Sequence, residues 1–278
     1  MFTISKRQLF DEKGRSVPAF GVFRDDNDRY LDTVGNGWQP IQSQAITDTV
    51  GKELQLFKPT IKEIQGGRQV IVTYALEHPI IIKGTQDIVQ SFLGFRINHG
   101  IGAVYSFVNT LRLVCTNGMK VAETERLLSL SHNGNADVRL IGAGQLLNDN
   151  IKGLQVFGKK LNRLAEIPLK IEDVGEITKA FFNRSETDNI YTNSRSQNQA
   201  RDILVAFEHN DGDKVKKVRG TAWNLLNAFT FYADHKWTFR TSDIEDIIQS
   251  KERVSVFGAG NDFKQKAFNN ITDYCKVS

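Results

Sequence analysis

Lysine and arginine side chains, clustered in several segments of this sequence, could bind a polyanion. Cationic side chains brought onto one face neutralise phosphates and make binding of a polyanion depend steeply on salt. The candidate nucleic-acid-binding residues are Arg96, Arg112, Lys159, Lys160, Arg163, Lys214, Lys216, Lys217 and Arg219. Further basic residues are Lys170, Lys251, Arg253, Lys264 and Lys266. The alternative is a solvated surface of alternating charge, because Asp211, Asp213 and Glu166 lie close in sequence.

Histidine and cysteine offer no pattern of metal ligands. The five histidines, His78, His99, His132, His209 and His235, are scattered, without an HExxH motif or a ligand pair at zinc spacing. We therefore expect no metal site. Asp234 and His235 could form a catalytic pair, but a histidine at a helix C-terminus is also stabilised by the helix dipole. We favour that structural role and assign no catalytic residue, which favours a protein that is not an enzyme.

Glycine-containing segments also have two readings. The triplets Gly142 to Gly144 and Gly258 to Gly260 precede expected helices, where a phosphate could bind. They lack the GxGxxG pattern and the P-loop lysine, so we interpret them as helix entries and expect no cofactor. Arg112 and Asn117-Gly118 could bind an anion, or the dipeptide could reverse the chain; we favour the reversal.

The composition is typical of a globular protein. The 278 residues are 40% hydrophobic and 24% charged, and the net charge of +4 permits a polyanionic partner without requiring one. No apolar run approaches the roughly 20 residues that cross a bilayer, and the N-terminus has no apolar stretch typical of a signal peptide. The two cysteines fit a reducing compartment. We expect a cytoplasmic protein with no membrane partner and, from its 18 phenylalanines, an aromatic core.

The first half of the sequence predicts strands and one helix. Gly66-Gly67 supplies the positive φ angles that a tight hairpin needs, and Ser43 is the expected helix cap. The expected strands are 17–24, 29–34, 60–65, 68–77, 87–98 and 102–115, and the expected helix is 44–56.

The second half predicts helices, from apolar residues repeated every three or four positions. Their expected ranges are 145–166, 171–182, 197–208, 221–236 and 262–275. The fold class is therefore α+β, with an antiparallel β-meander of hairpins and a flanking helix followed by a helical half. We predict a mixed domain over 1–140 and a mainly helical region over 141–278.

Three segments carry a family resemblance. VGNGWQPIQSQA (34–45), TLRLVCTNGM (110–119) and GTAWNLLNAFTFYADH (220–235) resemble the phage and plasmid family DUF932, a domain of unknown function. The resemblance implies a mobile-element setting and no particular reaction. Many relatives have an Asn-Ser-His-Asp-Gly turn where this chain has Asn98-His99-Gly100. Any function of the aspartate in that turn of the relatives is therefore not expected of this chain.

The leading hypothesis is a phage or plasmid protein that binds nucleic acid, favouring single-stranded DNA, with annealing activity and self-assembly into a homo-oligomer. Its order of helix, two hairpins and helix is similar to that of single-strand annealing proteins of the RecT and Redβ type, although no residue motif is shared. The alternative is an interaction protein that binds and blocks a host factor.

Overall fold

The computed structural model describes residues 1–56, 58–77, 79–85, 87–112, 118–120, 128–134, 144–182, 194–209, 216–236 and 259–277. They form two compact units. Unit 1 comprises Met1–Glu77, Phe92–Val108 and Glu123–Lys152, and unit 2 comprises His78–Ser91, Asn109–Ala122 and Gly153–Ser278. The predicted boundary between residues 140 and 141 lies outside the described residues and stays a prediction.

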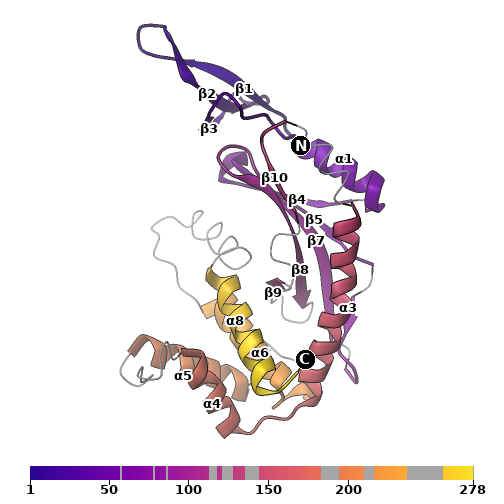
Figure 1. Cartoon of the computed structure of the whole chain (residues 1–278). Coiled ribbons are helices and arrows are strands. Elements are labelled where there is room, and N and C mark those ends of the chain that lie inside the picture. The colour runs from indigo at the N-terminus through magenta and orange to yellow at the C-terminus, as the bar shows by residue number, and fades with distance from the viewer. Residues whose placement is uncertain are drawn as a thin grey trace. The chain divides into compact units, whose positions relative to one another are not determined.

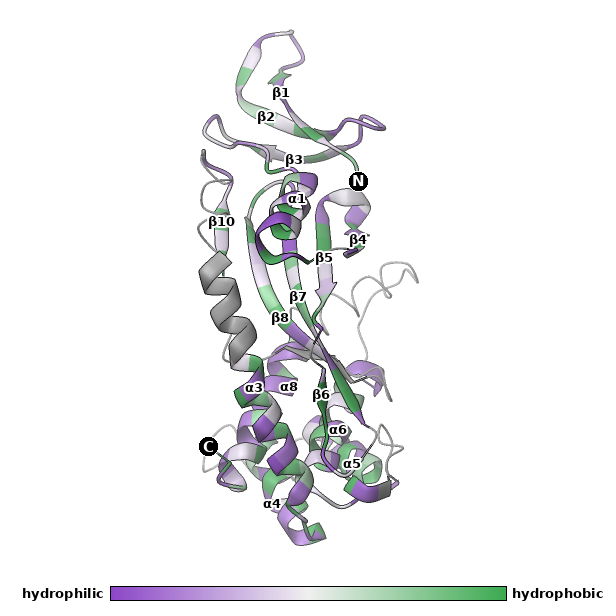
Figure 2. Ribbon diagram, turned by 90° about the vertical axis from the view of Figure 1, so that its right-hand side faces the viewer, coloured by the Kyte–Doolittle hydropathy of each residue, from purple (hydrophilic) through white to green (hydrophobic). Residues whose placement is uncertain are grey.

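Unit 1 begins with a three-stranded antiparallel sheet. Its strands are β1 (Ile4–Phe10), β2 (Ser16–Arg24) and β3 (Tyr30–Val34), in the order β1-β2-β3. The hairpin predicted around the Asp-rich turn is confirmed as β2 and β3, whereas β1 was not predicted. Figures 1 and 2 both show the β1-β2 hairpin projecting from the rest of unit 1.

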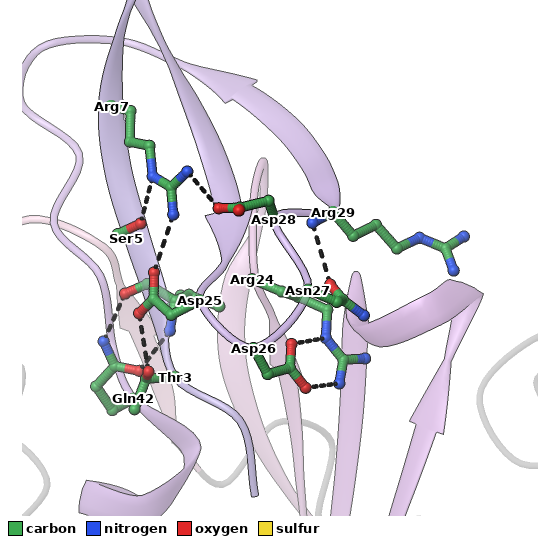
Figure 3. Close-up of polar contacts among 11 residues, drawn as sticks. Thr3, Ser5, Arg7, Arg24, Asp25, Asp26, Asn27, Asp28, Arg29 and Gln42 are labelled. Carbon is green, nitrogen blue, oxygen red and sulfur yellow. Dashed lines mark hydrogen bonds and ion pairs between the residues drawn. The ribbon is translucent and has the colours of Figure 1, made fainter.

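Charge pairs hold the turn between β2 and β3. Arg7 binds Asp28 at 2.7 Å and Asp25 at 3.4 Å, and Arg24 forms two bonds with Asp26 (Figure 3). Arg24 also binds Glu63 at 2.7 Å, and its guanidinium lies over the Phe2 ring. The cations on this sheet are therefore largely neutralised by their own neighbours.

A second, seven-stranded sheet follows. The main path runs β10-β8-β7-β5-β4, while β6 pairs with β7 and β9 with β8. The strands are β4 (Thr60–Ile64), β5 (Gln69–Ala75), β6 (Ile80–Ile81), β7 (Ile88–Asn98), β8 (Ala103–Arg112), β9 (Gly118–Lys120) and β10 (Ser129–Ser131). The predicted hairpins are confirmed. Gly66 and Gly67 have φ angles of 65° and 96° in the turn η1 (Gln65–Gly67), as the sequence indicated.

The helix α1 (Ser43–Leu54) buries Ile46 and Val50. Its position was predicted, but the role of Ser43 as its cap was wrong. The N-cap residue is Gln42, and the Ser43 hydroxyl instead lies 3.0 Å from Nε2 of His99. The Ser43 side chain therefore contacts a buried residue that is distant in sequence, and no local sequence pattern indicates this contact.

The helices of the second half confirm the α+β class. They are α3 (Gly144–Glu166), α4 (Ile171–Phe182), α5 (Ser194–His209), α6 (Ala222–Phe231) and α8 (Ala259–Tyr274), with a short 3-10 helix, η4 (Lys216–Val218), before α6 and a π-helical turn, η5 (Tyr232–Lys236), after it. Within the described part of the chain, no helix has the length and apolarity needed to cross a bilayer.

The helix α6 is the centre of the helical part of unit 2. It begins at the Thr221 cap, whose hydroxyl accepts a hydrogen bond from the backbone of Asn224, and its residues 222–230 are buried. It contacts α5, α8 and η5. Phe181 of α4 packs against Phe229 and Phe263, so the expected aromatic core is present here.

Candidate nucleic-acid interface

An antiparallel bridge in unit 2 joins two segments that carry predicted binding residues. Pro168 pairs with Thr221, the Leu169 amide donates to the Gly220 carbonyl at 2.9 Å, and the Ala222 amide donates to the Ile167 carbonyl at 2.9 Å. Proline cannot continue the helix α3, and Gly220, with φ of 72°, turns the chain ahead of α6. The residues that end α3 therefore run beside those that enter α6.

Cationic side chains flank this bridge on both segments. We call Lys159, Lys160, Arg163, Lys170, Lys217 and Arg219 the basic strap. Lys160 is half-buried and the other five side chains are exposed. Lys159 and Arg163 lie one helical turn apart on the same side of α3. The bridge thus brings together the backbone segments that follow the first group and end the second, with Lys170 and Arg219 next to the paired residues in sequence.

Two members of the basic strap already bind oxygen atoms. Arg163 lies 3.3 Å from Glu166, in an ion pair whose two side chains are exposed. Arg219 donates to the Glu208 carbonyl at 3.0 Å, near the end of α5, where the helix dipole favours a cation. Exposed ion pairs contribute only about 0–1 kcal/mol, so a phosphate oxygen can replace the Glu166 carboxylate at little cost.

Tyr274 places an aromatic ring near the basic strap, and sequence reasoning missed it. The ring is 40% exposed, and its hydroxyl donates to Asp173 at 2.9 Å and to Glu176 at 3.1 Å. The backbone amide of Lys170 donates to the same Asp173 carboxylate at 2.8 Å. The hydrogen bond to Asp173, together with Glu176, raises the pKa of Tyr274 to about 12, so its hydroxyl stays protonated. Tyr274 is distant in sequence from Asp173 and Lys170, so its position near the basic strap becomes apparent only from its contact with Asp173 in the folded chain.

The remaining predicted residues are not shown to belong to the basic strap. Arg96 is half-buried on β7 within unit 1. Arg112 ends β8 and Lys216 begins η4, but their side chains lie outside the described part, as does all of Lys214. Their roles stay predictions.

The two described lysines of the basic group near the C-terminus, Lys264 and Lys266, bind partners within the protein. Lys264 is 1% exposed and lies 2.8 Å from Asp234, and Lys266 donates to the Phe181 carbonyl at 2.5 Å. Burial lowers the pKa of Lys264, against the attraction of Asp234. Lys264 therefore cannot contact a phosphate in this structure. Lys251 and Arg253 lie outside the described residues.

The same contact bears on the hypothetical catalytic pair. Asp234 belongs to the π-helical turn η5 and binds the buried Lys264, while the His235 ring lies 4.8 Å from that of Phe231. These contacts fit the structural role favoured from the sequence. The side chain of Arg112, and Asn117, which would complete such a site, are not among the described groups.

Unit 1 contains a serine–histidine contact that sequence reasoning also missed. Nε2 of His99 faces the Ser43 hydroxyl, and Nδ1 lies 2.8 Å from the Gly67 carbonyl, which orients the ring. Burial lowers the pKa of His99 to about 4. This arrangement is typical of an activated nucleophile. Ser43 and His99 are nevertheless fully buried, so the contact fastens α1 to the sheet and offers no route for a substrate.

A second buried histidine joins the loops of unit 1. Nδ1 of His132 lies 3.0 Å from the Gln39 carbonyl and Nε2 lies 2.7 Å from the Asn98 carbonyl. Trp38 stacks on this ring and donates to the Gly100 carbonyl at 3.0 Å. Burial lowers the pKa of His132 despite the two carbonyls. Among the described residues, no cluster of three potential metal ligands occurs.

The comparisons with known proteins identify a family and no activity. The family model DUF932, a domain of unknown function, matches residues 30–254. No curated protein and no solved structure matches the chain. Two tryptophans in the matched region have packing roles: Trp38 stacks on His132, and Trp223 of α6 donates to the buried Asp87 at 3.1 Å. Because the match covers most of the sequence, the chain belongs to the family DUF932.

Proposed function

We propose that this protein binds nucleic acid through the basic strap, with a preference for single-stranded DNA. The observation that carries the proposal is the Pro168–Thr221 bridge, which sets the cationic end of α3 beside the cationic entry to α6. Lysine and arginine side chains that lie on one surface neutralise phosphates of a nucleic-acid backbone. The net charge of +4 supports association with a polyanion.

The preference for single strands rests on Tyr274. Its half-exposed ring lies near Lys170, and an unpaired base can stack on an aromatic ring while cations follow the backbone. Base–aromatic stacking contributes about 1–3 kcal/mol per base. The family resemblance adds a phage or plasmid setting in the host cytoplasm. Annealing of single strands by a homo-oligomer joins the proposal only through the similar order of elements in single-strand annealing proteins.

The test is a fluorescence-anisotropy titration with a labelled single-stranded oligonucleotide at low and high salt. The variant Lys217→Glu/Arg219→Glu should bind at least roughly tenfold more weakly than the parent chain, because each reversal removes an attraction and adds a repulsion. The matched control, Lys13→Glu/Lys52→Glu, has the same net charge and changes exposed lysines of unit 1. Equal losses in the two variants, or no binding by the parent chain at low salt, would refute the proposal.

A second candidate function is supported by one exposed side chain. Ile101 is 78% exposed at the β7-β8 turn, where its amide donates to Asp32 at 2.9 Å and the preceding carbonyl accepts from Trp38. A preorganised turn that presents an apolar side chain fits a protein partner, as in an inhibitor of a host factor. A host protein captured in the presence of nuclease, and lost with Ile101→Asp, would favour this function.

A further inference from the structure

The outer edge of β1 presents backbone groups ready to pair with another strand. The Asp25 amide donates to the Thr3 carbonyl at 3.0 Å, so the backbone groups of Thr3, and by alternation those of Ser5 and Arg7, point toward β2. The amides and carbonyls of the alternate residues Ile4, Lys6 and Gln8 therefore point away from the sheet. The structure shows this direction at Ile4. Its amide donates to Oε1 of Gln42 at 3.1 Å, and its carbonyl accepts from Nε2 of the same side chain at 2.8 Å.

Gln42 covers only one end of this edge. The Gln42 side-chain amide pairs with Ile4 as one residue of a neighbouring strand would. Within the described part of the chain, no hydrogen bond reaches the backbone of Lys6 or Gln8 from outside β1 and β2. The far end is limited by the bulge between Gln8 and Phe10. An open ladder therefore remains at Lys6 and Gln8.

Two other sheet edges are better protected. The exposed side chains of Lys62 and Glu63 place charges on β4, and charged residues discourage pairing at an edge. On β3, the outward-facing amide of Thr33 donates to the Asp32 carboxylate at 2.9 Å. The open stretch of β1 also carries cations, but Arg7 is paired with Asp25 and Asp28 and the Lys6 amine donates to two carbonyls of the same chain. No side chain occupies the outward backbone groups of Lys6 and Gln8 in the described part of the chain.

We propose that the partner at this edge is a second copy of the same chain, with the two β1 strands antiparallel across a two-fold axis. A two-fold pair of edge strands is self-complementary, because each copy offers the donors and acceptors that the other needs. The side-chain charges do not oppose this arrangement, because Arg7 is already paired with Asp25 and Asp28 and the Lys6 amine donates to the Asn36 and Trp38 carbonyls.

The surroundings of the edge also suit a copy of this chain better than a polyanion. Residues 1–34 contain as many acidic as basic side chains, so two copies do not repel each other and the sheet does not attract phosphates. Phe10, beside the open ladder, is 63% exposed and would be covered by the partner. The β1-β2 hairpin projects from the rest of unit 1 in both views, which leaves its edge accessible to a partner (Figures 1 and 2).

Sedimentation velocity of the full chain, without nucleic acid, tests the proposal separately from the basic strap. The parent chain should be a dimer at micromolar concentration. Gln8→Pro removes an outward amide and adds a bulky ring. Gln8→Ala is its control, because it also removes the glutamine side chain but keeps the backbone amide. Gln8→Pro should weaken the dimer by at least roughly tenfold relative to Gln8→Ala. A monomeric parent chain, or equal dimerisation by the two variants, would overturn the proposal.

A cross-link locates the interface. Every antiparallel register that uses Lys6 and Gln8 keeps the two copies of residue 8 within about 7–8 Å, one diagonal step of a strand pair. Gln8→Cys should therefore form a covalent dimer with a short bis-maleimide, beyond any formed by the native cysteines of the parent chain. Lys13→Cys, in the turn after β1, is the matched control. Equal cross-linking at the two positions would place the dimer interface elsewhere and overturn the assignment.

Discussion

Acidification should destabilise unit 1 through His99, whose ring is 1% exposed. Burial lowers the pKa of His99 from 6.5 to about 4 in the folded chain. Well above pH 6.5 the histidine is neutral in both the folded and the unfolded chain, so it adds no pH dependence there. As the pH falls from 6.5 to 4, the unfolded chain binds a proton that the folded chain does not, and stability is lost.

The size of the loss follows from the shift. A difference of one in pKa corresponds to about 1.36 kcal/mol, so lowering the pKa of His99 from 6.5 to about 4 removes roughly 3 kcal/mol of unfolding free energy across this range. His132, whose pKa burial also lowers, adds to the loss in the same direction. Because a globular domain is stable by only about 5–15 kcal/mol, the effect is large enough to measure.

Urea unfolding at several values between pH 7 and pH 4.5, followed by tryptophan fluorescence, measures it. His99→Gln removes the titrating ring and should flatten the profile, at a cost of about 1–3 kcal/mol at pH 7 from the altered bonds to Ser43 and Gly67. His209→Gln, at an exposed position of α5, is the control and should keep the parent profile. A parent chain whose stability is unchanged down to pH 4.5, or a His99→Gln profile as steep as that of the parent, would show that the buried His99 does not cause the loss of stability in acid.

Three further predictions concern packing. Asp234→Asn removes the carboxylate that lies 2.8 Å from the buried Lys264 amine and should lower the unfolding free energy by about 3–5 kcal/mol in a denaturant titration; an unchanged value would show that the pair is not buried in solution. Gly94→Ala should lower the melting temperature, because a Cβ there would lie 2.1 Å from the Phe107 ring, whereas Gly175→Ala in α4 meets open space and should raise it through a helix preference of about 1 kcal/mol; the opposite order would contradict the packing described. Trp38→Phe leaves the Gly100 carbonyl without its donor and should cost about 1–3 kcal/mol in the same titration, while an equal stability would mean that this bond is not formed.

Local patterns predicted much of the fold because they act over few residues. Gly66-Gly67 indicated a tight turn through its freedom to adopt positive φ, and the structure has this conformation at both glycines. The apolar sequence from Thr221 onward predicted the buried helix α6, which begins at that threonine's cap. These features need no information from distant segments.

The elements and contacts that sequence reasoning missed depend on distant partners. The strand β1 has the sequence ISKRQLF, without clear alternation, and its pairing with β2 and the Gln42 amide depends on the folded chain. The Ser43 hydroxyl followed a local cap pattern, but the distant His99 binds it. The Pro168–Thr221 bridge joins the two segments that carry basic groups, and the Tyr274 hydroxyl contacts Asp173. Both contacts link residues that are distant in sequence, so neither leaves a local signal.

Photochemical cross-linking of the full chain to a single-stranded oligonucleotide, with mass-spectrometric mapping of the attached peptides, would locate the nucleic-acid-binding surface. We predict attachment of the oligonucleotide within residues 159–170 and 216–221 and at Tyr274. The yield of these cross-links should fall in the variant Lys217→Glu/Arg219→Glu. Attachment confined to unit 1, or an unchanged pattern in the reversed variant, would contradict the assignment of the basic strap as the phosphate-binding surface.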